Sequence, residues 1–262
     1  MTNAPRALVT NDDGISSEGL RRLALVARAA GLDVVVAAPA YESSGTSAGL
    51  TAVGSDGRVS VEQRHLADLN GVPTYAVTAL PGYITLIATR GAFGPPPDLV
   101  LSGINRGTNT GNAILHSGTV GAALTAGSNG CRALAVSLEV GHTGDSGADD
   151  GPHWLSASRW TGRVLPWLVE ADRPVVLNLN VPNRRADQVR GLRRAGLARF
   201  GSVQTNIAEV GEGHVTVSVS EIDAENDPGT DAVLVAEGYA TLTPLQPICE
   251  ATQCWLSALL EG

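Results

Sequence analysis

Asp12 and Asp13 are adjacent carboxylates that directly follow the apolar residues 7–9 and precede a glycine. The apolar run is typical of a short buried strand, and the apolar spacing within residues 16–30 predicts an amphipathic helix. A strand followed by a helix places both carboxylates at the carboxyl end of the first strand, where open α/β sheets bind ligands. Neighbouring carboxylates repel each other unless a cation lies between them or one of them is protonated. The pair therefore indicates a site for a hard divalent ion such as Mg²⁺ or Mn²⁺, with a solvated Asp-Asp-Gly turn as the alternative.

A second polar loop, residues 41–49, follows the predicted strand at residues 33–38 and belongs to the same edge of the sheet. Its small hydroxyl residues and glycines leave backbone N–H groups open to an anion, although a flexible linker has the same composition. Residues 45–49 also match the Gly-x-Ser-x-Gly nucleophile elbow of serine hydrolases. That elbow requires a helix immediately after it, and the residues that follow are not helical, so we do not expect a serine hydrolase.

A third loop, residues 103–112, follows the predicted strand at residues 98–102 and is rich in Gly and Asn. Asn tolerates a left-handed backbone and offers a carbonyl oxygen as a ligand. Residues 117–119, Ser-Gly-Thr, then begin a predicted helix that runs to about residue 127. A helix N-terminus presents free N–H groups and the positive end of the dipole to an anion, and plain capping by Ser117 or Thr119 is the alternative.

Strands and helices alternate over the first 182 residues, which predicts an α/β fold with a doubly wound, mostly parallel, Rossmann-like sheet. The remaining predicted strands are residues 72–77, 133–138 and 175–181, and the remaining predicted helices are residues 81–90 and 154–169. After Pro182 the chain becomes arginine-rich, and residues 214–220 alternate like a β-ribbon strand. Residues 249–260 close the chain as a predicted helix. We therefore expect an α/β catalytic core at residues 1–182 and a β-rich extension with a C-terminal helix at residues 183–262.

The chain carries a net charge of −8, and its 18 basic residues are all arginine. An acidic chain with scattered arginine is a poor binder of polymeric nucleic acid, which requires a basic face. The absence of lysine excludes a P-loop and argues against response-regulator receivers and haloacid-type phosphatases, which use a lysine beside the phosphorylated aspartate. The first strand-to-helix turn lacks Gly-x-Gly-x-x-Gly, which argues against a dehydrogenase.

Cys131, Cys249 and Cys254 show no Cys-x-x-Cys spacing, so the sequence indicates neither a disulfide framework nor a zinc site. The first residues have no signal-peptide core, and no apolar run approaches about 20 residues. We therefore expect a cytoplasmic protein that does not bind a membrane.

Taken together, these stretches resemble the SurE family of metal-dependent 5′/3′-nucleotidases (survival protein E). The resemblance is carried by residues 8–15, 38–39 with 44–45, 98–107, 109, 111, 114–120 and 237–245. It implies one divalent metal ion, Mg²⁺ or Mn²⁺, held by Asp12, Asp13, Ser44 and Asn105. It also implies substrate contacts from Asn11, Ser44, Gly45, Thr46, Asn109, Ser117, Gly118 and Thr119. Family members form dimers or tetramers that exchange the C-terminal segment, so the resemblance implies a homodimer or homotetramer that uses residues 183–262.

Three positions depart from the family pattern and concern substrate preference and subunit contacts. Residues 79–83 read Ala-Leu-Pro-Gly-Tyr where the family usually has Gly-Thr-Pro-x-Asp. The His-Ser pair common near residues 48–49 is absent, and Gln246 stands where a His is common. None of these positions is an expected metal ligand.

The sequence and the resemblance together predict a metal-dependent phosphomonoesterase that hydrolyses nucleoside monophosphates to nucleoside and phosphate. Asp12, Asp13 and Asn105 are its expected catalytic residues, through the metal that activates a water. We expect His116 to be structural rather than to protonate the leaving oxygen. The alternatives are a phosphatase specialised for one biosynthetic nucleotide-like phosphate ester, and a non-catalytic regulator that binds nucleotide or metal.

Overall fold

A computed structural model describes residues 4–45, 47–49, 58–140, 151–172, 174–199, 203–211, 214–221 and 228–250. Most of the strands form one nine-stranded sheet, in the order β3-β4-β2-β1-β5-β6-β7-β11-β8. From β4 to β7 the neighbouring strands are parallel, whereas β3 pairs with β4, and β11 with β7, in antiparallel fashion. The strands span β1 (Arg6–Thr10), β2 (Asp33–Pro39), β3 (Val61–Gln63), β4 (Thr74–Val77), β5 (Leu99–Arg106), β6 (Arg132–Leu138), β7 (Val176–Val181), β8 (Leu192–Arg194) and β11 (Ala240–Leu245). The predicted α/β, mostly parallel sheet is confirmed.

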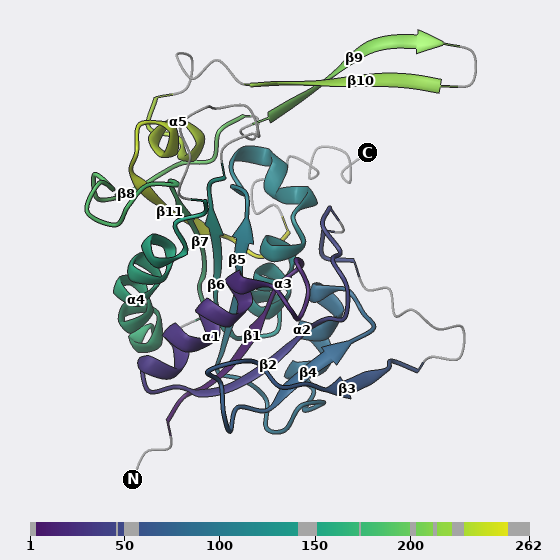
Figure 1. Cartoon of the computed structure of the whole chain (residues 1–262), viewed down its shortest axis with the longest axis vertical. Helices are drawn as coiled ribbons and strands as arrows, with labels where there is room; N and C mark the ends of the chain where they lie inside the picture. Colours follow the sequence, from purple (N-terminus) through teal and green to yellow (C-terminus); the bar gives the residue numbers. More distant parts are fainter. Residues whose placement is uncertain are drawn as a thin grey trace, which may run out of the picture.

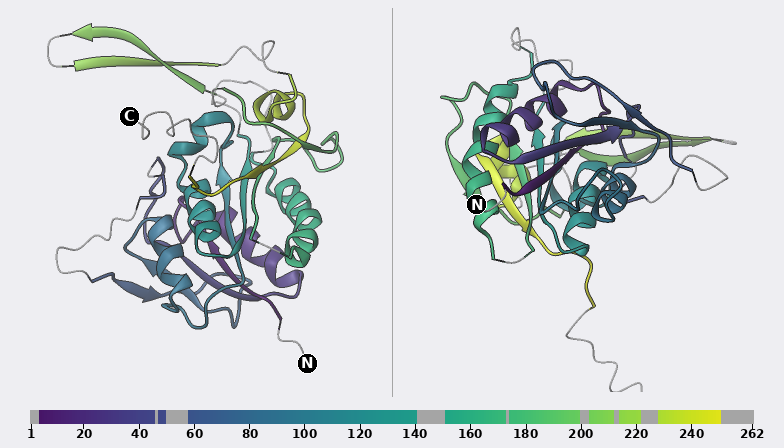
Figure 2. Two further views of the ribbon diagram at one scale, coloured as in Figure 1. Left: turned by 180° about the vertical axis from the view of Figure 1, so that it is seen from behind. Right: turned by 90° about the horizontal axis from the view of Figure 1, so that it is seen from below.

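Helices cover both faces of the sheet, as Figures 1 and 2 show. The helices span α1 (Glu18–Ala29), α2 (Pro81–Thr89), α3 (Gly118–Ser128), α4 (Trp154–Glu170) and α5 (Asp231–Ala236), with a 3₁₀ turn η1 (Gly111–His116) before α3. On one face, Leu23 of α1 and Leu165 of α4 pack in a buried cluster with Val9 of β1. On the other face, Val120 of α3 packs in a second cluster with Leu8. Since adjacent strand residues point to opposite faces, β1 contributes to both halves of the core.

The face that α2 and α3 cover is apolar at the amino ends of the strands and polar at their carboxyl ends. Its apolar part includes Leu8, Val100, Ala135 and Val176, and residues two or four positions further along these strands have polar side chains on the same face. These polar residues are Thr10, Ser102, Ser137, Asn178 and Asn180, and each is 0% exposed. A buried polar layer therefore lies beneath the loops at the carboxyl edge of the sheet.

Strand β5 is longer than the sequence predicted, because it continues beyond Ser102 to Arg106. The pairing of β5 with β6 shifts register between Ser102 and Asn105, so the extra residues pass through an irregularity rather than a new loop. Gly103 makes this possible: its φ is +129°, and a Cβ there would lie 2.2 Å from the carbonyl oxygen of Val136. The shift places Asn105 opposite Ser137, at the carboxyl edge of the sheet.

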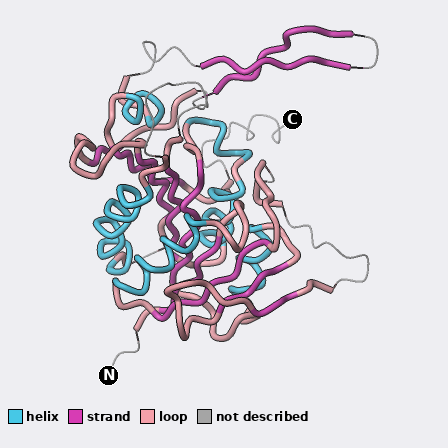
Figure 3. Tube along the Cα trace, viewed as in Figure 1, coloured by secondary structure: helices cyan, strands magenta, loops and turns pink. Residues whose placement is uncertain are grey.

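The segment after residue 182 contributes to two structures. Strands β8 and β11 join the main sheet, whereas β9 (Val203–Gly211) and β10 (His214–Glu221) form a separate antiparallel pair. This ribbon projects away from the body of the molecule, as Figures 1 and 3 show. The predicted strand at residues 214–220 is therefore confirmed, while most of the predicted helix at residues 249–260 lies outside the described residues. In the part of the chain that is described, no helix is long and apolar enough to cross a membrane.

Candidate active site

Asp12 lies just beyond the end of β1 and is bound by the first turn of α3. Its side chain is buried, with the residue 3% exposed. Oδ2 accepts the backbone N–H of Thr119 at 3.1 Å, and Oδ1 accepts the Thr119 hydroxyl. Burial raises the pKa of Asp12, although these hydrogen bonds oppose the shift. The helix N-terminus that was expected to receive an anionic ligand thus holds the carboxylate of Asp12.

The close approach of α3 to Asp12 depends on Gly118. A Cβ at this position would lie 2.8 Å from Oδ2 of Asp12 and 2.9 Å from its Cβ. Ser117, the N-cap of α3, accepts the N–H of Val120 at 3.1 Å, so its hydroxyl fixes the same turn. The sequence Ser-Gly-Thr therefore combines a cap, a residue without a side chain and a double hydrogen-bond donor at one point of the site.

Asp13 is half-buried and faces β5, where its Oδ2 accepts the backbone N–H of Arg106 at 3.3 Å. Burial and, second, the neighbouring charge of Asp12 raise the pKa of Asp13 to about 6. Among the ion pairs of the described residues, none involves either carboxylate. In the described part of the chain, the two carboxylates therefore lie close together without an ion pair to a side-chain cation.

The raised pKa of Asp13 predicts that the metal-free protein loses stability as the pH rises. The folded state binds this proton more tightly than the unfolded chain, whose aspartate pKa is near 3.8. The stabilising contribution is complete at low pH and is lost as the pH rises from about 4 through about 6. Thermal unfolding in the presence of a chelator should therefore show a smaller Tm loss between pH 5 and pH 7 for Asp13→Asn than for the unmodified protein. Equal pH dependence of the two proteins would contradict the placement of Asp13.

The loop after β2 lies against the backbone of Asp12. Ser43 donates its N–H to the carbonyl oxygen of Asp12 at 2.8 Å and its hydroxyl to the same oxygen at 3.3 Å. Ser44, the expected ligand, is exposed, and its hydroxyl donates to Oε1 of Glu42 at 3.1 Å. Gly45 follows with φ +78°, whereas Thr46 lies outside the described residues. The structure therefore brings the Ser43–Ser44 segment next to Asp12 through the backbone of Ser43.

Ser47, the central residue of the elbow-like motif, is not arranged as a hydrolase nucleophile. Its hydroxyl donates to the carbonyl oxygen of Leu115, and its N–H donates to the carbonyl oxygen of His116 at 3.3 Å. The His116 side chain is exposed, so this histidine contributes a backbone contact to the loop. These bonds attach the loop to the turn before α3 and give Ser47 no side-chain base.

Asn11, an expected substrate contact, supports the start of α1. Its Nδ2 donates to the carbonyl oxygen of Gly14 at 3.1 Å and to Oγ of Ser17 at 2.7 Å. Ser17 in turn caps α1 by accepting the N–H of Leu20. Asn11 is fully buried, and its Oδ1 has no hydrogen-bond partner in the described structure. The side chain thus fixes the turn that carries Asp12 and Asp13.

Asn105 and Asn109 are held in different ways. Asn105 donates its Nδ2 to the carbonyl oxygen of Gly107 at 2.8 Å, which leaves Oδ1 as the ligand atom of this amide. Asn109 donates its N–H to Oδ1 of Asn180 and its Nδ2 to Oγ of Ser137, each at 2.8 Å. The carbonyl oxygen of Asn109 accepts the amides of both Asn178 and Asn180 at 2.8 Å. Asn109 is therefore anchored in the buried polar layer beneath the site.

The side chains that anchor Asn109 are not predicted by the sequence patterns. Asn178 and Asn180 lie in the predicted apolar strand at residues 175–181, and Ser137 lies in the predicted strand at residues 133–138. Two asparagines at alternate positions of a buried strand share one face, and buried amides need hydrogen-bond partners. That pattern was visible in the sequence, but the partner was not.

Asp231, also missed, binds the site loop to the C-terminal part of the chain. It is 0% exposed, and its carboxylate accepts the N–H groups of Gly111 at 2.9 and 3.1 Å, Ala198 at 3.1 Å and Ala232 at 2.9 Å. Burial raises the pKa of Asp231, although the backbone hydrogen bonds oppose the shift. One carboxylate therefore joins the loop before α3, the segment leading to β9 and the start of α5.

Asp231→Asn should lower the free energy of unfolding by about 2–4 kcal/mol, because an amide N–H₂ would replace an acceptor that faces several backbone donors. Denaturant unfolding monitored by circular dichroism measures the change. Asp187→Asn is the matched control, since Asp187 is exposed and its ion pair among the described residues is a 3.6 Å contact with Arg185, so the change should alter stability by less than about 0.5 kcal/mol. Equal stability of the two variants would show that the Asp231 contacts carry no net energy.

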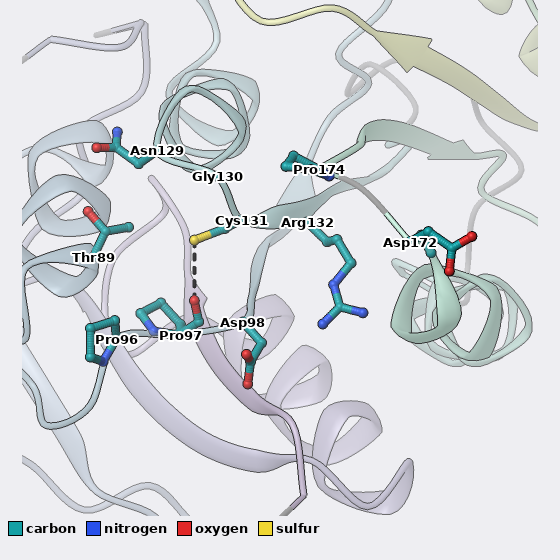
Figure 4. Close-up of a pocket in the computed structure, with 11 residues that line it drawn as sticks. Thr89, Pro96, Pro97, Asp98, Asn129, Gly130, Cys131, Arg132, Asp172 and Pro174 are labelled. Carbon is teal, nitrogen blue, oxygen red and sulfur yellow. Dashed lines mark hydrogen bonds between the residues drawn. The ribbon is translucent and has the colours of Figure 1, made fainter.

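A cavity of about 420 Å³ lies elsewhere, at the amino ends of β5 and β6 (Figure 4). Asp98, Cys131 and Arg132 line it, and the Cys131 thiol donates to the carbonyl oxygen of Pro97 at 3.2 Å. Burial raises the pKa of this thiol, so it stays protonated at neutral pH. No expected site residue lines this cavity, which is at the opposite edge of the sheet from Asp12.

The side chains near Asp12 fit a hard divalent ion. The expected ligands offer oxygen atoms alone: two carboxylates, the Ser44 hydroxyl and the amide oxygen of Asn105. Within the described ranges, no three His, Cys, Asp or Glu side chains gather as a metal-binding group, so a nitrogen- or sulfur-rich site is absent there. The repulsion that helps to raise the pKa of Asp13 is the interaction that a bound cation would remove. Mg²⁺ or Mn²⁺ therefore matches the donor set.

The fold and this acidic, oxygen-rich edge define an α/β protein with a candidate cation site at the carboxyl ends of β1 and β5. The family model described as Survival protein SurE matches residues 7–205. The chain is 32% identical over 247 residues to a protein named 5′-nucleotidase SurE from Aeromonas hydrophila, covering 92% of this chain and 91% of that protein. It is 34% identical over 247 residues to a 5′/3′-nucleotidase SurE from Shigella dysenteriae, covering 92% and 90%. The chain belongs to the SurE family.

A solved structure supports the same relationship. The crystal structure of a SurE protein from Aquifex aeolicus matches with a TM-score of 0.78 and 27% sequence identity, covering 98% of this chain and 100% of that one. The match therefore includes the segment after residue 182 as well as the strands that position Asp12.

Proposed function

We propose that this protein is a metal-dependent phosphomonoesterase that hydrolyses nucleoside monophosphates to nucleoside and phosphate. The observation that carries the proposal is the Asp12–Asp13 pair, which α3 and β5 hold without an ion pair to any described side-chain cation. The relatives named 5′-nucleotidase and 5′/3′-nucleotidase, which align over 92% of the chain, support the substrate class.

The proposed metal ligands are Asp12, Asp13, Ser44 and Asn105. A bound Mg²⁺ or Mn²⁺ supplies positive charge that polarises the phosphoryl group and offsets the charge that develops on it. Thr119 fixes the carboxylate of Asp12 through its N–H and hydroxyl, and Asn105 is fixed through Gly107. The chain's own contribution is to hold these oxygens in place before substrate binds.

The proposed substrate-binding residues fall into two groups, according to whether their hydrogen-bond donors already bind other groups of the protein. Donors of Asn11, Asn109 and Thr119 already bind within the protein, so these residues position the site and offer a phosphate only their remaining groups. Ser44 and Gly45 are exposed beside Asp12, and Ser117 and Gly118 lie at the first turn of α3. We propose that Ser44, Gly45 and Thr46, together with Ser117 and Gly118, contact the phosphoryl oxygens.

Phosphate release from a panel of nucleoside 5′- and 3′-monophosphates tests the proposal. With Mg²⁺ or Mn²⁺ present we expect turnover, and with a chelator we expect none. Turnover of several nucleotides would match a broad nucleotidase, and turnover of one nucleotide-like ester would match the specialised phosphatase. Binding of nucleotide or metal without turnover of any ester would match the non-catalytic regulator and contradict the proposal.

We further propose that residues 183–262 form a β-rich extension used to build a homodimer or homotetramer, next to a catalytic core at residues 1–182. The projection of the β9–β10 ribbon from the body supports this use, since its described strands pair only with each other. Light scattering of the purified protein measures the assembly directly. The cytoplasmic location stays a prediction from the sequence.

A further inference from the structure

Tyr41 is the most exposed large apolar side chain at the edge of the candidate site, with 81% of its surface in solvent. The other exposed aromatic side chain of this kind in the described structure is Trp167, on α4, at 58%. Single exposed apolar residues are common on protein surfaces, so exposure alone has no meaning. The position of Tyr41 relative to Asp12 and Asp13 is what distinguishes it.

The backbone of Tyr41 packs directly on the turn that carries the carboxylates. A Cβ at Gly14 would lie 3.3 Å from the carbonyl carbon of Tyr41, so these two backbone segments are in close contact. Two residues further on, Ser43 donates its N–H to the carbonyl oxygen of Asp12 at 2.8 Å. The start of the loop is therefore fixed to the acidic turn, while the ring of Tyr41 remains in solvent.

A second exposed apolar side chain marks the far end of the same loop. Ser47 binds the carbonyl oxygens of Leu115 and His116, and the Leu115 side chain is 68% exposed. The loop that begins at Tyr41 is thus attached through Ser43 to Asp12 and through Ser47 to the turn that carries Leu115. Of the two exposed aromatic side chains of the described structure, Tyr41 is the one in the loop that contacts Asp12.

We propose that the ring of Tyr41 is the surface on which the nucleobase of the substrate stacks. This inference rests on the proposed function and names the residue that recognises the base. Stacking uses the flat face that every nucleobase has, so it favours nucleotides over simple phosphate esters without selecting one base. A tyrosine supplies this area at low entropic cost, because only two side-chain torsions are immobilised.

The test compares Tyr41→Ala, Tyr41→Phe and Trp167→Ala on two substrates, AMP and ribose 5-phosphate, at saturating Mn²⁺. Ribose 5-phosphate carries the phosphate and sugar but has no base. For Tyr41→Ala we expect kcat/KM for AMP to fall about tenfold, mainly through KM, with kcat/KM for ribose 5-phosphate unchanged. Tyr41→Phe keeps the ring and should behave as the unmodified protein, and Trp167→Ala removes an exposed ring far from the site and should also be unchanged.

Two results would overturn the inference: an equal fall for both substrates, which indicates a disturbed loop, or no fall for AMP. If the unmodified protein hydrolyses neither ester, the proposed function itself fails, and calorimetric binding of AMP decides the role of Tyr41. Tenfold weaker binding by Tyr41→Ala than by Tyr41→Phe would support stacking. Equal binding by the two variants, or no binding by the unmodified protein, would exclude it.

Discussion

An Asp12→Asn variant is expected to release phosphate from AMP at least about 1,000-fold more slowly than the unmodified protein at saturating Mn²⁺. The amide removes the charge of one of the two carboxylates that we propose as metal ligands. It also places an N–H₂ donor against the N–H and hydroxyl of Thr119, which both donate to Asp12. Steady-state phosphate release measures the effect, and calorimetric titration with Mn²⁺ should show the loss of metal binding.

Asp187→Asn is the control for this variant, because it makes the same chemical change at an exposed position away from the site. Its turnover should equal that of the unmodified protein. The metal assignment would be contradicted if Asp12→Asn folded normally, as measured by circular dichroism, and kept more than about one tenth of the activity.

Gly118→Ala is expected to lower turnover by about 100-fold or more while the fold is retained. The added Cβ would lie 2.8 Å from Oδ2 of Asp12, so the carboxylate must move from its position. Gly118 is the first residue of α3, so alanine should not weaken the helix if the contact with Asp12 were unimportant. Overpacking costs about 1–3 kcal/mol, and the effect on activity is expected to exceed this effect on stability.

Gly162→Ala in α4 is the matched control for Gly118→Ala. A Cβ at Gly162 would lie 3.9 Å from Cγ1 of Val26, which is an ordinary contact, so the change should leave activity unaltered. Steady-state kinetics and thermal unfolding of both variants separate the two effects. Normal activity of Gly118→Ala would show that the α3 turn does not position Asp12 for catalysis.

Local sequence patterns were sufficient to predict the elements that carry the carboxylates. The apolar run before Asp12, the helix spacing after it and the β-branched run of β2 each depend on near neighbours in the chain. The predicted α1 and β2 therefore match the observed Glu18–Ala29 and Asp33–Pro39 closely. The predicted end of β5 at residue 102 was wrong. The register shift at Gly103 depends on the neighbouring strand β6 and on the close approach of Val136, which local patterns do not contain.

Long-range contacts of the site could not be predicted from the sequence. Thr119 reaches Asp12 across 107 residues, and Asp231 reaches Gly111 across 120. Both contacts follow from the order of strands in the sheet, which brings β5 beside β1 and β11 beside β7. The sequence indicated an anion at the start of α3, but the anion in the structure is a side chain of the protein itself.

The most direct measurement is an anomalous-difference map from a crystal of this protein grown or soaked with Mn²⁺. We expect one strong peak within coordinating distance of the Asp12 and Asp13 carboxylates, with the Asn105 amide oxygen beside it. A map with no peak there, or with its strongest peak bound by other residues, would contradict the proposed metal site.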